Sequence, residues 1–270
     1  MPERTPLAGV DLLLADLDGV VYAGDRALPH AVESITRVQR RIPVGYVTNN
    51  ASRTDAAVAA QLRELGLDAE PEHVVTSPQA AMKLLHDLVE PGSLVLAVGG
   101  EGLTAELGKH GFRVTRSADD APAAVVQGFA PEVGWTQLAE AAFALRPLPG
   151  SSPGTDGIPW VATNMDWTIP VARGTAPGNG TLVSAVHTAV GRMPVVAGKP
   201  ERAIFDAAVE RFSASAPLFV GDRLDTDILG ANRAGIRSVL VLTGIDGAKQ
   251  VLAAEPESRP DVVLADPACT

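Results

Sequence analysis

Two aspartates near the N-terminus have the type and spacing to do chemistry together. The short apolar run Leu12–Ala15 is typical of a strand buried on both faces, and it leads directly into Asp16, with Asp18 two residues later and Gly19 after it. Two carboxylates about 4 Å apart repel each other by about 4 kcal/mol at an effective dielectric constant of about 20. Because Gly19 permits a sharp turn, both can face one small space, where either a cation holds them together or one stays protonated.

An isolated pair of this kind more often caps a loop, so its interpretation depends on the rest of the chain. An EF-hand is excluded, because the loop lacks a third acid at its fifth position and a Glu at its twelfth. Gly99–Gly102 follows an apolar strand, but its spacing is wrong for a dinucleotide-binding turn and indicates an ordinary strand-to-helix connection.

Two further apolar runs also end in polar residues. Residues 43–48 lead to Thr48, Asn49 and Asn50, and residues 218–221 lead to Asp222. In a doubly wound parallel sheet all such ends meet at one edge, where these folds bind ligands. The sequence therefore predicts an α/β fold with a Rossmann-like, doubly wound parallel sheet that brings these ends together.

A lysine adds the sharper indication of function. Lys199 stands at the start of a predicted helix over residues 201–212, where the helix dipole disfavours a cation. A local rule broken in this way indicates a functional residue. Asp225 and Asp227 stand at the start of the helix predicted over 226–234, where the helix dipole favours acids. Helix stabilisation therefore explains Asp225 well. Asp227 is a candidate for orienting metal-bound water.

These residues suit the transfer of a phosphoryl group. Asp16 and Asp222, with a backbone carbonyl, form an oxygen set that fits Mg²⁺. Asp16 is then the candidate nucleophile that forms an aspartyl phosphate, and Lys199 neutralises charge on the transferred group. The Thr48 hydroxyl and the N–H groups near Asn49 would hold phosphate oxygens. Asp18 would protonate the leaving alcohol and then take a proton from water.

Four motifs in this order resemble those of the haloacid dehalogenase superfamily of phosphatases: DLDGV (16–20), VTNN (47–50), GKP (198–200) and GDRLDTDI (221–228). The insertion between the second and third motifs is where the subfamily with a large α/β cap carries it, so the chain resembles this subfamily, which includes the p-nitrophenylphosphatase group. TNNASR, the PGNG element (177–180) and GDRLDTDI together are similar to bacterial glycerol-3-phosphate phosphatases; phosphoglycolate and pyridoxal phosphate phosphatases are related.

The resemblance assigns a role to each matching residue. It implies that Asp16 is nucleophile and metal ligand, that Asp18 is acid/base and carbonyl ligand, and that Asp222 is the third ligand. Thr48, Asn49, Asn50 and Lys199 would bind the substrate phosphate. The expected activity is Mg²⁺-dependent hydrolysis of a small phosphate monoester, with glycerol 3-phosphate as the leading candidate and phosphoglycolate or pyridoxal phosphate as alternatives. A homodimer formed through the cap is a candidate assembly.

Domain boundaries follow from the element pattern and the resemblance. Residues 1–79 and 194–270 are expected to form the catalytic core, and residues 80–193 an inserted α/β cap. The Pro/Gly/Ser-rich stretch 146–159 is predicted to be a cap loop. Asn164, Asp166 and Asn179 are polar cap residues for which substrate contact and local capping are equally good explanations.

Composition excludes several other classes of protein. The 270 residues carry a net charge of −10, which disfavours nucleic acid and anionic membranes as partners. The single cysteine, Cys269, leaves no internal disulfide, and no apolar stretch approaches the length of a membrane span. The N-terminal apolar run is interrupted by aspartates and so does not resemble a signal peptide, and we expect a cytoplasmic protein.

Two other functions use related residues. A phospho-aspartate receiver module also combines clustered acids, a Thr and a Lys, but it is about half this length and lacks the Asp-x-Asp pair. A dehalogenase needs no Mg²⁺ and generally lacks the second aspartate, so Asp18 argues against it.

Overall fold

The strand that leads to Asp16 lies in the middle of a six-stranded sheet with the order β15-β14-β13-β1-β4-β5. Strand β1 (Leu12–Ala15) runs parallel to β13 (Pro217–Gly221) on one side and to β4 (Val44–Thr48) on the other, with Ala15 opposite Val220 and Tyr46. The remaining strands are β5 (Val74–Thr76), β14 (Arg237–Val241) and β15 (Val262–Leu264). This central position explains why all four residues of β1 are buried.

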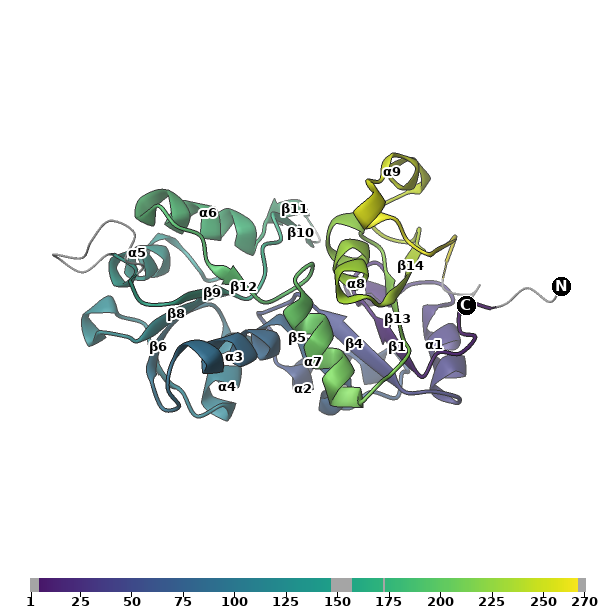
Figure 1. The fold of residues 1–270 in the computed structure, drawn as a ribbon, viewed down its shortest axis with the longest axis horizontal. Helices are drawn as coiled ribbons and strands as arrows, with labels where there is room; N and C mark the ends of the chain where they lie inside the picture. Colours follow the sequence, from purple (N-terminus) through teal and green to yellow (C-terminus); the bar gives the residue numbers. More distant parts are fainter. Residues whose placement is uncertain (1–4, 147–156, 172, 267–270) are drawn as a thin grey trace. The chain divides into compact units, whose positions relative to one another are not determined.

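Helices cover both faces of this sheet (Figure 1). On one face, helices α1 (Ala31–Gln39) and α2 (Asp55–Glu64) pack Ile35 and Leu62 into a core that includes Leu13 and Ala15. Because side chains alternate along a strand, Leu14 and Phe219 point to the other face. There Phe205 of α7 (Arg202–Phe212) meets Phe219 edge-on, with ring centroids 5.0 Å apart. Helix α8 (Leu229–Ala234) packs beside α7.

Smaller elements complete this part of the chain. A hairpin of β2 (Tyr22–Ala23) and β3 (Arg26–Ala27) follows the Asp18 turn, and α9 (Ala248–Ala253) follows β14. The helix expected over 226–234 is in fact a π-helical turn, Leu224–Ile228, continued by α8. Such turns are frequently found at functional sites.

A second sheet has five parallel strands in the order β12-β9-β8-β6-β7. Its strands are β6 (Leu94–Val98), β7 (Arg113–Thr115), β8 (Ala124–Gln127), β9 (Trp160–Ala162) and β12 (Val195–Val196). Helices α3 (Ser77–Leu88) and α4 (Glu101–Lys109) lie on one side of this sheet, and α5 (Trp135–Ala144) and α6 (Asn179–Val190) lie on the other (Figure 1). A hairpin of β10 (Thr168–Val171) and β11 (Gly174–Pro177) precedes α6.

The computed structural model describes residues 5–146, 157–171 and 173–266, and the chain divides into two units around these sheets. The first unit comprises Met1–Thr48, Asp55–Val75 and Lys199–Thr270, and the second comprises Asn49–Thr54 and Thr76–Gly198. The α/β fold predicted from the sequence is confirmed, with parallel strands forming both sheets.

The expected boundaries at 80 and 193 differ from those of the second unit. Strand β12, expected in the core, pairs with β9 of the second sheet and so extends this unit to Gly198. Thr76 begins it, and its hydroxyl accepts the Gln79 N–H and caps α3. Most of the loop predicted over 146–159 lies outside the described residues.

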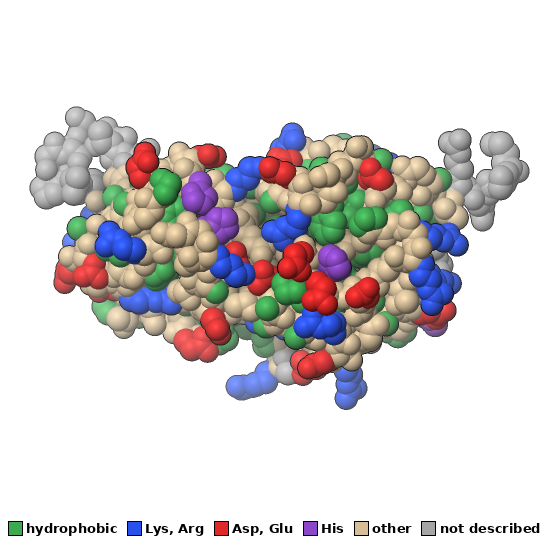
Figure 2. All heavy atoms as spheres, turned by 90° about the horizontal axis from the view of Figure 1, so that it is seen from below, with side chains coloured by type: hydrophobic (Ala, Val, Ile, Leu, Met, Phe, Trp, Pro, Cys, Tyr) green, Lys and Arg blue, Asp and Glu red, His purple; other side chains and the backbone are tan. Residues whose placement is uncertain are grey.

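The surface carries mixed charge. On the face drawn in Figure 2, lysine and arginine side chains alternate with aspartate and glutamate and form no continuous basic patch among the residues drawn in colour. Within the described ranges, every helix is too short or too polar to cross a membrane.

Candidate active site

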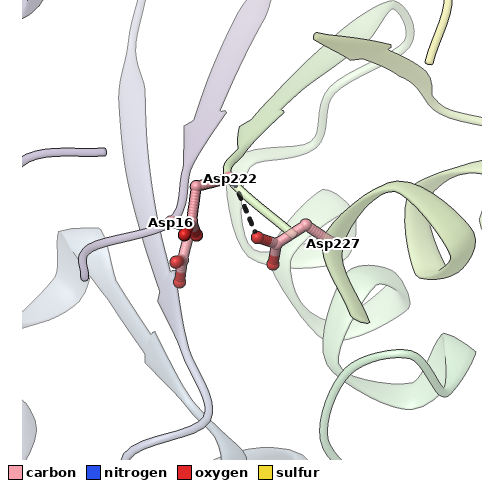
Figure 3. A group of neighbouring side chains, drawn as sticks. All are labelled: Asp16, Asp222 and Asp227. Carbon is pink, nitrogen blue, oxygen red and sulfur yellow. Dashed lines mark hydrogen bonds between the residues drawn. The ribbon is translucent and has the colours of Figure 1, made fainter. Parts of the chain in front are cut away.

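Three aspartates from two strand ends point into one space (Figure 3). Asp16 follows β1 and Asp222 follows β13, and the Asp16 N–H donates to the carbonyl of Val220 at 2.9 Å. Asp227 comes from the π-helical turn after β13. All three are buried, and one carboxylate oxygen from each lies within 4.8 Å of the others. The sheet register thus brings together residues about 200 positions apart.

Lys199 joins two of these carboxylates. Its Nζ lies 2.5 Å from Asp16 Oδ1 and 2.7 Å from Asp227 Oδ1, and it also donates to the carbonyl of Val47 at 3.4 Å. The side chain is only 3% exposed. Burial by itself lowers the pKa of this ammonium, but the charges of Asp16 and Asp227 outweigh burial and hold its pKa above the usual value, so Lys199 is a cation at neutral pH.

Asp227 binds both the main chain of its own turn and the Lys199 side chain. Its Oδ2 accepts the backbone N–H groups of Asp222 and Arg223, each at 3.1 Å; the first of these bonds is the dashed line in Figure 3. Its Oδ1 forms the ion pair with Lys199. Sequence reasoning proposed only a role beside metal-bound water and missed this ion pair, because nothing local in the sequence couples positions 28 residues apart.

Asp222 has the features of a cation ligand. Its Oδ2 accepts the Ile245 N–H at 2.7 Å, while its Oδ1 is buried without a hydrogen-bond partner among the described residues. Burial, followed by the charge of Asp227, raises its pKa to about 7. A Cβ on Gly19 or on Gly244 would collide with its carboxylate, so both glycines leave room for that group.

The charge balance of the cluster also favours a cation. Burial raises the pKa of Asp16 well above its usual value; Lys199 opposes this shift, while Asp227 and Asp222 add to it. Among the described residues, three buried carboxylates share a single ammonium, so at neutral pH the cluster either keeps a proton or binds a cation. Hard oxygen donors of this kind fit Mg²⁺.

Asp18 follows Asp16 by two residues. It is exposed, in a turn closed by the Gly19 N–H donating to the carbonyl of Tyr22 at 2.9 Å. Gly19 has φ +83°, the left-handed conformation that the predicted sharp turn requires. An exposed carboxyl on such a turn can exchange protons with a bound molecule or with water.

The predicted phosphate contacts fall in both units. Thr48 ends β4, is buried and belongs to the first unit, whereas Asn49 and Asn50 belong to the second. The Asn49 amide donates to Asp166 Oδ1 at 2.9 Å. The Asn50 side-chain oxygen accepts the Ser52 N–H at 2.9 Å, so this side chain also stabilises its own loop.

Two of the polar residues considered for substrate contact have clear structural partners. Asn164 donates to the carbonyl of Asn49 at 2.7 Å, and Asn179 donates to the carbonyl of Asn164 at 2.8 Å. Both are buried, which favours a structural role for them. Asp166 is half-buried and binds Asn49.

The fold and the site together define an α/β enzyme whose acidic, lysine-containing site is suited to a hard cation. Comparison with known proteins gives the family: the model of the haloacid dehalogenase-like hydrolases matches residues 13–113, and a second model, described as HAD-hydrolase-like, matches residues 196–268. The chain belongs to this family, as the four motifs predicted.

Individual relatives are similar along nearly the whole chain. The D-glycerol 3-phosphate phosphatase of Mycobacterium tuberculosis is 48% identical over 253 residues, which are 94% of this chain and 69% of that protein. The crystal structure of a glycerol phosphate phosphatase from the same organism, in complex with magnesium, superposes with a TM-score of 0.91 at 46% identity and covers 98% of this chain and 78% of that one. A p-nitrophenyl phosphatase from Archaeoglobus fulgidus superposes with a TM-score of 0.84 at 26% identity, and the match covers 96% of this chain and 97% of that one.

Proposed function

We propose that this protein is a Mg²⁺-dependent phosphatase that hydrolyses small phosphate monoesters, with glycerol 3-phosphate as its preferred substrate. The observation that carries the proposal is the buried cluster in which Lys199 bridges Asp16 and Asp227 beside the unpartnered oxygen of Asp222. Support for the substrate comes from the 48% identity to a curated D-glycerol 3-phosphate phosphatase.

Asp16 is the proposed nucleophile. In the first step its carboxylate oxygen attacks phosphorus, the bond from phosphorus to the ester oxygen breaks, and an aspartyl phosphate forms on Asp16. Lys199, already held against Asp16, neutralises negative charge on the transferred group. The Thr48 hydroxyl at the end of β4 and the N–H groups after it bind phosphate oxygens.

Asp18 moves the protons. Its carboxyl group donates a proton to the leaving alcohol in the first step, and the resulting carboxylate accepts a proton from the water that hydrolyses the aspartyl phosphate. Its exposed position on the turn after β1 suits an exchange with both molecules. Asp16 is regenerated as inorganic phosphate leaves.

Asp16, Asp222 and the main-chain carbonyl of Asp18 would hold the Mg²⁺ ion, with Asp227 outside the ligand set, where it pairs with Lys199 and accepts two main-chain N–H groups. Bound there, the ion would compensate the excess carboxylate charge and stabilise charge on the phosphoryl group. The unpartnered Asp222 Oδ1 supports this assignment.

The proposal also covers the binding partners, the oligomeric state and the cellular location of the protein. We expect a small-molecule substrate and no nucleic-acid partner, in line with the net charge of −10 and the mixed charges of the face in Figure 2. A homodimer through the second unit and a cytoplasmic location remain part of the proposal. The receiver alternative loses support, since the curated relatives described above are phosphatases.

A substrate panel tests the proposal. Released phosphate is measured with Mg²⁺ for glycerol 3-phosphate, 2-phosphoglycolate and pyridoxal phosphate, with Asp16→Asn as the matched control because it keeps the shape of the side chain but loses the attacking charge. We expect the highest kcat/KM for glycerol 3-phosphate and only background turnover by the variant. A preference for pyridoxal phosphate would overturn the substrate, and an active Asp16→Asn would overturn the mechanism.

A further inference from the structure

The chain segment after β14 extends past the end of β13 to the turn that carries Asp18. Strand β13 lies between β14 and β1 in the sheet, so β14 and β1 do not pair with each other. Thr243, two residues after β14, nevertheless donates its hydroxyl hydrogen to the main-chain carbonyl of Gly19, with 2.6 Å between the two oxygens. The two residues are 224 positions apart, and both belong to the first unit. The bond therefore connects the turn after β1 to a segment that enters from two strands away.

Gly19 is held at both of its main-chain polar groups. Its N–H donates to the carbonyl of Tyr22 at 2.9 Å, and its carbonyl accepts the Thr243 hydroxyl. Because the peptide group between Asp18 and Gly19 is planar, the direction of the Gly19 N–H also sets the direction of the Asp18 carbonyl. A glycine at φ +83° has no side chain that restricts its backbone, so without these bonds the peptide group could rotate. The two bonds together thus fix the orientation of the Asp18 carbonyl.

The same segment also holds Asp222. The Ile245 N–H donates to Asp222 Oδ2 at 2.7 Å, and the Asp246 N–H donates to the main-chain carbonyl of Asp222 at 3.1 Å. A Cβ on Gly19 would collide with the Asp222 carboxylate, so the turn and this carboxylate are in direct contact. One short segment therefore positions both the turn and the carboxylate.

We propose that Thr243 is a positioning residue for the Mg²⁺ site, because it fixes the Asp18 carbonyl through Gly19. The proposal rests on the function proposed above, in which Asp16, Asp222 and the Asp18 carbonyl hold the ion. A ligand oxygen that already points in one direction loses little conformational freedom when the ion binds, and this strengthens binding. The hydroxyl of Thr243 therefore contributes to Mg²⁺ affinity without contacting the ion.

Thr243→Val tests the proposal, because valine keeps the shape of the side chain but cannot donate a hydrogen bond. Mg²⁺ binding is measured without substrate, by titration calorimetry and by the rise of the melting temperature with Mg²⁺ concentration. We expect the dissociation constant of Mg²⁺ to rise by about tenfold, the lower end of the loss typical for a group that orients a metal ligand. Thr243→Ala, which also lacks the donor, should behave in the same way. Thr243→Ser keeps the hydroxyl and should stay within about twofold of the wild type.

Thr188→Val is the matched control, because the Thr188 hydroxyl also donates to a main-chain carbonyl, that of Ser184 at 2.8 Å, in the second unit. It should leave the dissociation constant unchanged. An unchanged constant in Thr243→Val and Thr243→Ala, with or without a loss of stability in chelator, would overturn the proposal. A loss in Thr243→Ser as large as in Thr243→Val would also overturn it.

Failure of the phosphatase function would appear separately, as a wild-type protein that releases no phosphate from any ester. Because Mg²⁺ binding is measured without substrate, the same pattern of dissociation constants in such a protein would still support the role of Thr243.

Discussion

Replacing Lys199 by Met removes the only cation from the buried aspartate cluster, as far as the described residues show. The change keeps a long apolar stem but leaves Asp16 and Asp227 without the ammonium that lies 2.5 and 2.7 Å from their oxygens. Each of these pairs is worth about 6 kcal/mol at an effective dielectric constant of about 20. The cost of burying the ammonium cancels much of that attraction, and the loss of one partner of a buried pair typically costs about 3–5 kcal/mol.

A loss of this size is a large part of the free energy of unfolding of an ordinary domain, about 5–15 kcal/mol. We expect urea unfolding, followed by far-UV circular dichroism in the presence of chelator, to show it clearly. Mg²⁺ should stabilise the variant more than the wild type, because the variant offers the ion a more negative site. Activity should fall by about 10²–10³-fold, since a donor aimed at developing charge is lost.

Lys249→Met is the matched control, because Lys249 is an exposed lysine on α9 of the same unit and should have little effect on stability. If Lys199→Met in chelator were as stable as Lys249→Met, the buried ion pairs of Lys199 would not stabilise the fold. Full activity of Lys199→Met would refute the assignment of Lys199 to the transferred phosphoryl group.

Four other perturbations have defined outcomes. Asp18→Asn should lower turnover of an alkyl phosphate by about 10²–10⁴-fold but let aspartyl phosphate accumulate from p-nitrophenyl phosphate, whose leaving group needs little protonation; unchanged rates on both esters would make Asp18 structural. EDTA should abolish activity and Mg²⁺ restore it, with Ca²⁺ supporting little turnover, and full activity in excess chelator would contradict the metal site. Gly244→Ala should raise the Mg²⁺ concentration needed for half-maximal activity by about tenfold or more, since its Cβ displaces the Asp222 carboxylate; an unchanged requirement would argue against Asp222 as a ligand. Burial and then His86 lower the pKa of His110, so the stabilisation from neutral His110 is present above pH about 6.5 and is lost as the pH falls below it. The melting temperature of His110→Gln should therefore fall less between pH about 7.5 and about 5.5 than that of the wild type. Equal falls would exclude the His86–His110 pair as the cause.

The strand ends could be predicted from the sequence because their signal is local. Four or five apolar residues followed by Asp16, Thr48 or Asp222 indicate a buried parallel strand with a polar end, and the sheet edge then follows from the fold class. The structure places Asp16 and Asp222 on adjacent strands, β1 and β13. The contacts between side chains have no such local signal, which is why the position of Lys199 between two carboxylates could not be predicted.

Other elements were missed for reasons that are equally physical. Strand β10 contains Pro170, and a proline within an apolar run argues against a strand unless it lies at an edge, as it does in this two-stranded hairpin. Strand β12 has only two residues, so the sequence pattern could not show that it pairs with β9. The π-helical turn that carries Asp227 has the same composition as the first turn of an ordinary helix.

The glycines after β6 show why a motif needs its structural context. A Cβ on Gly102 would collide with the carbonyl of Arg53, and the Gly102 N–H donates to the carbonyl of Ser52 at 3.4 Å. The main chain of residues 49–54 thus occupies the place where a dinucleotide-binding turn would receive its ligand. This contact explains why Asn49–Thr54 belongs to the second unit although Thr48 belongs to the first. The segment that continues directly from Thr48 is therefore held in place by contacts within the second unit.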